Sequence, residues 1–327
     1  MRENECALLY EGIGGRRATR LLGAVGILLL WCSAAWGQTT FGSIGGSVSD
    51  PTGAIIPGAQ VTLTNLGTSE RRVTPSNTDG LYQFVNLVPG RYRIDVEKEG
   101  FKHFTRDPIV VEVQNALRID VTLEVGSLTQ RVEVTAQTPL LQPQASDLGQ
   151  VVEERKATEL PLNGRNPLNL AALVPSVIPL GGAMANPTGQ NLSAVGNYMI
   201  GGAMAGQGAI YVDGVPVNTI GWGDVSLVPT QDSLQEFKVQ TNNLSAEWGR
   251  FAGGVINFTT KSGTNAVHGT AYEFLRNKVL NANTFFGNAG GLDRPPFVQN
   301  QFGANAGGPF VIPHFYDGRN KTFWFAS

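Results

Sequence analysis

Residues 116–125 read Ala-Leu-Arg-Ile-Asp-Val-Thr-Leu-Glu-Val, a run in which apolar and polar side chains alternate. Successive side chains of a β-strand point to opposite faces, so this run predicts a strand with one buried and one solvated face. Residues 91–97 alternate in the same way. About seven such strands over residues 41–126 predict a small antiparallel sandwich of two sheets. The turn signals that separate them are Asp50-Pro51-Thr52-Gly53, Asp79-Gly80 and Pro89-Gly90.

The composition extends this β character to the whole chain. There are 41 glycines and 18 prolines, and long apolar patterns of helical period are scarce. We therefore expect a mainly β fold. The formal net charge is -2 and the charged fraction is only 15%. A nucleic-acid-binding protein would show basic clusters that match phosphates, so this composition argues against a nucleic-acid partner.

The N-terminal segment predicts export. Three arginines among residues 16–20 precede an apolar run over residues 21–31, and the small residues Ala35 and Gly37 occupy the -3 and -1 positions of a cut after Gly37. The alternative is a membrane anchor, but the run is shorter than the ~20 residues that span a bilayer. We expect a signal peptide over residues 1–37.

The residue types that carry most enzyme and metal chemistry are sparse. Both cysteines, Cys6 and Cys32, precede the predicted cut, so the mature chain would have no thiol. His103, His268 and His314 lie far apart in sequence and lack the spacing of a zinc site. We expect no catalytic residue, no metal ligand and no cofactor, and we expect that the protein is not an enzyme.

Several motifs in the first predicted domain appear in a familiar order. They are Gly-Ser-Val-Ser-Asp-Pro-Thr-Gly-Ala (46–54), Pro-Gly-Ala-Gln-Val-Thr (57–62), Asp-Gly-Leu-Tyr-Gln-Phe (79–84), Leu-Val-Pro-Gly-Arg-Tyr (87–92) and Gly-Phe (100–101). Residues 41–126 resemble the carboxypeptidase regulatory-like domain, which implies a transthyretin-like sandwich. Carbohydrate-binding modules share that broad fold class, so glycan binding is an analogy. Tyr82, Phe84 and Tyr92 alternate with polar residues, which favours the core over a sugar-stacking surface.

The chain changes character after residue 126. Val132-Glu-Val-Thr135 predicts a short strand, followed by a polar linker through Pro143. One helix is expected from Val151 towards Glu159. A second is expected with Asn166 as its cap and Pro167 at its first position, ending before Pro175.

Strands and tight turns dominate the next hundred residues. Residues 210–216 predict two strands joined by an Asp-Gly turn. Ser233 and Glu236 have capping-box spacing, but the alternation that follows limits any helix there to a short one. Another strand is expected to run through Thr260.

These segments carry a second resemblance. The motifs are Val-Glu-Val-Thr-Ala (132–136), Leu-Pro-Leu-Asn-Gly-Arg (160–165), Tyr-Val-Asp-Gly (211–214), Gln-Glu-Phe-Lys-Val-Gln (235–240) and Gly-Gly-Val-Ile-Asn (253–257) leading to Gly263. Together they resemble the plug of TonB-dependent receptors of the Oar-like group, which places an α+β plug at residues 127–263. In that family the plug sits inside a large barrel and is rearranged by a periplasmic energy-coupling protein of the TonB type.

The last 64 residues fit the start of such a barrel. Candidate strands at residues 268–275, 301–309 and 322–325 carry aromatics suited to a lipid-facing girdle. The alternative is an ordinary soluble sheet. We expect residues 264–327 to hold the first strands of an incomplete outer-membrane barrel, which makes the chain the N-terminal part of a receptor.

The leading hypothesis is energised ligand uptake across the outer membrane, with the sandwich and plug facing the periplasm. Implied partners are a TonB-type protein, outer-membrane lipid and a glycan or other small ligand, whose binding residues are unknown. Val132, Glu133, Val134 and Thr135 are the candidate contact with TonB, because a short extended segment can add to a partner's sheet; a linker strand is the alternative. A secreted or surface carbohydrate-binding sandwich is the second hypothesis, and an enzyme is the third.

Overall fold

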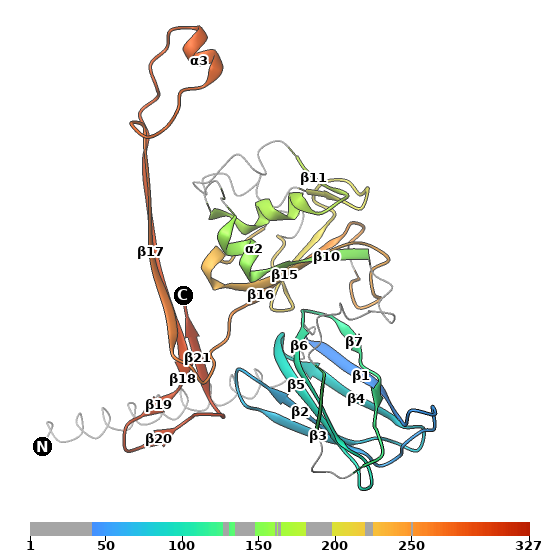
Figure 1. Ribbon diagram of the computed structural model, residues 1–327. Helices are drawn as coiled ribbons and strands as arrows, with labels where there is room; N and C mark the ends of the chain where they lie inside the picture. Colours follow the sequence, from blue (N-terminus) through green and yellow to red (C-terminus); the bar gives the residue numbers. More distant parts are fainter. Residues whose placement is uncertain are drawn as a thin grey trace, which may run out of the picture. The chain divides into compact units, whose positions relative to one another are not determined.

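The computed structural model gives the arrangement of most of the chain after residue 40 (Figure 1). The predicted signal peptide over residues 1–37 and the linker that follows residue 134 lie outside the described residues. The described residues are 41–126, 131–134, 148–160, 162, 165–180, 198–219, 225–249 and 251–327.

Two sheets form the first domain, which we call the sandwich (residues 41–126), and one strand from beyond residue 126 extends the second sheet. One sheet contains β4 (Leu81–Leu87), β1 (Gly42–Ser49) and β7 (Ala116–Arg118), with β8 (Val121–Thr122) also on β1. The other has five strands in the order β3-β2-β5-β6-β9. Their bounds are β3 (Arg71–Pro75), β2 (Gln60–Asn65), β5 (Gly90–Glu97), β6 (His103–Val111) and β9 (Arg131–Val134).

The sequence predicted an antiparallel sandwich, and this prediction is wrong for three of its strands. β7 and β8 both lie parallel to β1, and β9 lies parallel to β6. The run at residues 116–125 is divided into β7 and β8, and between them the Ile119 amide donates to the Gly45 carbonyl oxygen of β1 at 2.8 Å. Alternation identified the extended chain but carries no information about the direction of its neighbour.

The predicted apolar faces meet in one core. Ile94, Leu117 and Val121 are buried, with at most 3% of any of these residues exposed. Tyr82, Phe84 and Tyr92 are also in the core, which confirms that part of the prediction. Burial of Tyr82 leaves its hydroxyl one protein partner, the Ile119 carbonyl oxygen at 2.6 Å.

A second sheet system follows, which we call the central sheet. Its order is β10 (Leu148–Glu153), β15 (Leu234–Asn242), β16 (Val255–Thr260), β13 (Ala209–Val212) and β14 (Val215–Pro216). The helix expected from Val151 is wrong at its start, because residues 151–153 belong to β10 and α2 covers only Glu154–Glu159. Val152 pairs with Phe237 of β15 and is buried. A β-branched residue packs well in a sheet, which explains why residues 151–153 form a strand and not the start of a helix.

Two local signals around the central sheet are confirmed. The Asn166 side chain accepts the Leu168 amide at 3.0 Å and caps the 3₁₀ helix η2 (Pro167–Leu173). Asp213 and Gly214 both have positive φ, 49° and 81°, in the turn between β13 and β14. The capping box suggested by Ser233 and Glu236 is wrong, because the short 3₁₀ helix η4 (Gln231–Ser233) ends at Ser233 and β15 begins at Leu234. A two-stranded sheet of β11 (Val177–Pro179) and β12 (Tyr198–Ile200) also packs on this core.

The C-terminal strands form a separate sheet in the order β17-β18-β21. β17 (His268–Asn277) and β18 (Val298–Pro309) make the long hairpin of Figure 1, which carries α3 (Phe285–Ala289) near its tip. β21 (Phe323–Ala326) pairs with the end of β18, and β19 (Val311–Ile312) pairs with β20 (Tyr316–Asp317). All three predicted strands are therefore present. In the described part of the chain, no helix is long and apolar enough to cross a membrane.

Candidate functional site

The segment proposed from sequence as the TonB contact is partly a strand in the structure. Residues 131–134 form β9, and Thr135 lies outside the described residues. β9 runs parallel to β6 in a register that places Arg131 opposite His103 and Val134 opposite Arg106. The sequence predicted the strand but gave no indication that the edge of the sandwich would be its neighbour.

A cluster of side chains around Arg165 joins the region of the central sheet to the hairpin. Arg165 forms an ion pair with Asp232, and its guanidinium lies 4.0 Å from the ring centre of Phe274 and 4.8 Å from that of Tyr272. The side chains of the pair are only 13% and 17% exposed, so water screens the charges weakly. Tyr272 and Phe274 therefore face an arginine, which corrects the expectation that aromatics of this strand face lipid. Phe302 of β18 is 78% exposed and still suits that role.

A second cluster joins the central sheet to the sandwich. Glu236 of β15 accepts the Val113 amide, and Lys238 donates to the Gln114 carbonyl oxygen at 3.3 Å. Gln235 donates to the Pro89 carbonyl oxygen at 2.9 Å. Burial raises the pKa of Glu236 to about 7, and nearby acidic groups add to that rise. This carboxyl group is therefore poised to change charge near neutral pH.

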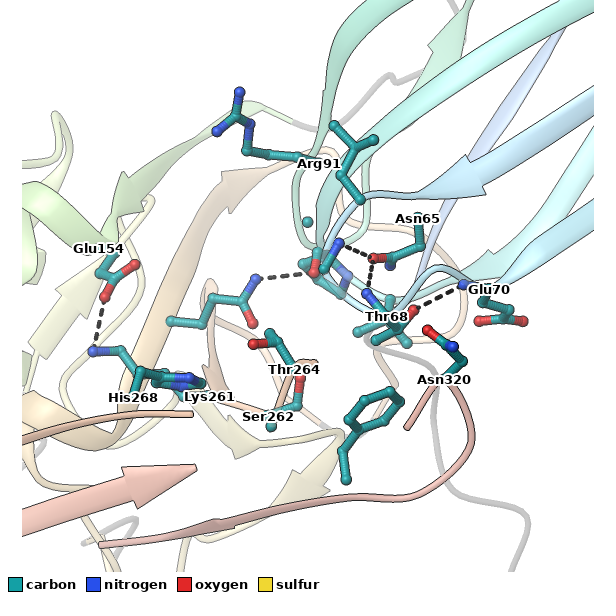
Figure 2. A pocket seen from close by; sticks show the side chains of 18 of the residues that line it. Asn65, Thr68, Glu70, Arg91, Glu154, Lys261, Ser262, Thr264, His268 and Asn320 are labelled. Carbon is teal, nitrogen blue, oxygen red and sulfur yellow. Dashed lines mark hydrogen bonds and ion pairs between the residues drawn. The ribbon is translucent and has the colours of Figure 1, made fainter. Parts of the chain in front are cut away.

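A cavity of about 870 Å³ lies where the sandwich, the central sheet and the C-terminal strands meet. Figure 2 shows Glu154 and Lys261 on one side, joined by an ion pair of 2.8 Å, and Asn65, Thr68 and Glu70 on another. The Asn65 side-chain oxygen Oδ1 accepts the Gly67 and Thr68 amides at 2.8 and 3.0 Å, so the turn that borders the cavity is fixed by its own side chain. The lining mixes charges of both signs without a convergent constellation for catalysis.

The three histidines do not form a site together. His103 is on β6, 3.6 Å from carboxylate oxygens of Asp95 and Glu97, while His268 begins β17 and His314 lies between β19 and β20. Within the described residues there is no group of three or more His, Cys, Asp or Glu side chains that could hold a metal ion. Tyr82, Phe84 and Tyr92 are buried and offer no ring face to a sugar.

The residues that make these contacts were not singled out by the sequence. Arg165 stood only inside a motif, Glu236 was expected only as a helix-capping residue, and no sequence pattern marked Asp232. The available signal was the presence of Glu236 and Lys238 on alternate positions of a strand that also holds Leu234, Phe237 and Val239. Charged side chains are rarely buried unless paired, so buried charges at those positions imply a polar surface packed against the strand.

Comparison with known proteins first defines a class. Residues 43–124 match the model of the carboxypeptidase regulatory-like domain, and residues 259–327 match that of the outer membrane beta barrel domain. The chain therefore resembles outer-membrane receptors that carry this domain at the N-terminus. More particularly, it is 28% identical to the TonB-dependent transporter Oar of Myxococcus xanthus over 95% of its own length. The chain spans 28% of the length of that relative.

Solved structures add little. A 3-chlorocatechol 1,2-dioxygenase from Rhodococcus opacus is 11% identical over 28% of this chain and 62% of its own, with a TM-score of 0.23. A streptococcal ancillary pilin is 12% identical over 27% of this chain and 33% of its own, also at 0.23. These scores carry no argument about function. The sequence similarities support an outer-membrane location and a resemblance to transporters rather than to an enzyme family.

Proposed function

We propose that the chain is the N-terminal part of a receptor for energised ligand uptake across the outer membrane. The observation that carries this proposal is that all three regions match one transporter in the same order along the chain. Similarity to a TonB-dependent transporter extends over 95% of the chain and spans the sandwich, the central sheet and the hairpin in that order. A fold shared by the sandwich alone would not produce similarity over the other two regions.

Each region has a role in this proposal. Residues 1–37 are the export signal, residues 41–126 a periplasmic domain, residues 127–263 the plug, and residues 264–327 the start of the barrel. The exposed apolar residues of the hairpin support contact with lipid, since Leu275 of β17 and Phe302 of β18 are 55% and 78% exposed. Arg165 supports plug-to-wall contact because it bridges Asp232 and the rings of β17.

The energy-coupling partner is proposed to bind Val132–Thr135. The extended backbone of β9 supports this assignment, because strand addition needs a segment that is already able to pair by main-chain hydrogen bonds. The transported ligand and any glycan bound by the sandwich have no residue assigned to them.

A photo-crosslinking amino acid at residue 133 tests the proposal in cells that make the protein in its natural outer membrane. We expect a crosslink to TonB that disappears when the tonB gene is deleted. The same probe at Val73, an exposed position on the opposite edge strand β3, is the matched control and should give no such product. Equal crosslinking at both positions, or none at residue 133, would contradict the assignment.

A further inference from the structure

The pairing of β9 with β6 connects two features that the sequence treated as separate. β9 occupies the end of the five-stranded sheet β3-β2-β5-β6-β9. Its inner edge pairs with residues 103–106 of β6. Among the described residues, no strand pairs with its outer edge.

The edge of β6 limits where a strand can add. Beyond Arg106, β6 contains Pro108, which has no amide hydrogen to donate. Proline on an edge strand blocks continued pairing. Residues 103–106 are therefore the part of this edge before the proline, and β9 covers that stretch residue for residue.

Pairing on one edge leaves β9 able to pair on the other. In a strand, the amide and carbonyl groups of successive residues point alternately to the two edges. Pairing with β6 thus uses the backbone groups of alternate residues of β9, and the remaining groups face the outer edge. A further strand can add there without displacing β6.

Holding β9 in place also changes the energetics of strand addition. Ordering the backbone of a free segment costs conformational entropy at every residue, and a partner that binds such a segment must offset that cost. When the sandwich already holds the four residues of β9 extended, most of that cost does not fall on the partner.

We infer that the sandwich is a platform that presents the contact segment to the energy-coupling protein, whose strand becomes the sixth of this sheet. This inference rests on the proposed contact at Val132–Thr135. It assigns the carboxypeptidase regulatory-like domain a direct part in the encounter with TonB, through the edge of β6.

A reversible cross-link tests the platform. In the full chain with Cys6 and Cys32 replaced by serine, His103→Cys and Arg131→Cys lie opposite one another in register. Neighbouring strands are about 4.8 Å apart, within the Cα range of about 4.4–6.8 Å that a disulfide bridges. The cross-link fixes β9 on β6 while leaving Val132–Thr135 unchanged.

The readout is binding of the purified C-terminal domain of a TonB protein by the oxidised and the reduced chain. We expect the oxidised chain to bind as tightly as the reduced one, within about threefold, or more tightly. The matched control is Gln60→Cys with Glu97→Cys, an exposed pair in register between β2 and β5 that links the same sheet without holding β9. It should bind equally in both states.

Hydrogen exchange gives the second readout on the unmodified chain. Residues 131–134 should be protected before the TonB domain is added, and residues 103–106 should stay protected afterwards. Loss of protection at residues 103–106, or binding at least tenfold weaker in the oxidised chain, would mean that TonB displaces β9 and would overturn the platform while leaving the contact intact. Absence of binding in both states would overturn the proposed contact and the platform together.

Discussion

The sandwich and the hairpin show the same alternation of side chains and opposite burial. In the sandwich, Ile94 and Leu117 are almost completely inaccessible because the facing sheet covers them. In the hairpin, Leu275 and Phe302 are 55% and 78% exposed although each lies in a well-paired strand. Alternation therefore specifies a strand, and only the surroundings decide whether its apolar face is covered by protein.

The two regions also attach to the rest of the chain by different chemistry. The sandwich meets the central sheet through backbone groups near Val113 and buried charges on β15. The hairpin meets it through aromatic rings beneath Arg165. A buried carboxyl group makes the first attachment sensitive to pH, whereas the second depends on the planar shape of a guanidinium group that stays charged.

The largest expected loss of stability comes from replacing a closely packed glycine, and it should differ between the sandwich and the hairpin. A Cβ at Gly46 would lie 1.8 Å from the Ile119 carbonyl oxygen, so Gly46→Ala must move backbone and should destabilise the sandwich by about 4 kcal/mol or more. In the hairpin, a Cβ at Gly303 meets only the end of the Tyr272 side chain. Gly303→Ala should cost below about 1 kcal/mol, because that ring can move.

Urea-dependent hydrogen exchange of peptides from each region measures both effects. Gly45→Ala is the control for Gly46→Ala, since the nearest atom to its Cβ is 3.5 Å away. Similar losses for the adjacent glycines would show that the close approach of β1 to residue 119 is not what limits the sandwich.

The next effect concerns the apolar faces. Ile94→Ala removes a fully buried side chain and should destabilise the sandwich by about 2–5 kcal/mol through lost burial and the cavity that remains. Leu275→Ala, at a position 55% exposed, should change the stability of the hairpin by less than about 0.5 kcal/mol in detergent-free solution. The same exchange measurement distinguishes the two variants. A comparable loss of stability in Leu275→Ala would contradict the conclusion that protein leaves the apolar face of the hairpin uncovered.

The alternating runs made much of this fold predictable. The sequence identified the strands of the sandwich, the Asp213-Gly214 turn, the Asn166 cap and all three C-terminal strands, because each depends on local periodicity or on one residue's backbone preference. It missed the parallel pairing of β7, β8 and β9, since the direction of a neighbouring strand depends on contacts between residues far apart in the chain.

The same limit applies to the candidate site. Val132–Val134 were predicted as a strand from their own alternation, but their position on β6 depends on residues 103–106, about 28 positions earlier. Tyr272 and Phe274 were assigned to lipid because aromatic residues of barrel strands are common there. Arg165, more than 100 residues away, covers that side of the strand instead.

The stability of the contact between the sandwich and the central sheet should depend on pH, unlike that of the contact at Arg165. The pKa of Glu236 rises from 4.5 to about 7 on folding, so the folded state holds a proton that the unfolded state releases. Stability from this group is fully present below about pH 4.5 and is lost as the pH rises through about 7, by about 3 kcal/mol in all. Glu236→Gln should remove this dependence, as followed by exchange at residues 112–115 between pH 5 and pH 8. The groups that face Glu236 are Glu112, Glu153 and Lys238. A slope unchanged in Glu236→Gln would assign the pH dependence to Glu112, whose pKa burial also raises.

The smallest effect belongs to the arginine that holds the hairpin. Arg165→Lys keeps the positive charge near Asp232 but loses the planar contact with the two rings, which should cost about 1 kcal/mol. A double-mutant cycle with Phe274→Leu isolates the ring contact, since Phe274 lies 4.0 Å from the guanidinium carbon and takes no part in the ion pair. The opening free energy of residues 231–233 from hydrogen exchange is the measured quantity. A coupling energy of about 0.5–1 kcal/mol is expected, and strictly additive losses would mean that the ion pair alone fixes Arg165. Because Arg165 and Asp232 both lie in the region of the central sheet, the rings of β17 would then contribute nothing through Arg165, and the hairpin would depend on other contacts for its attachment.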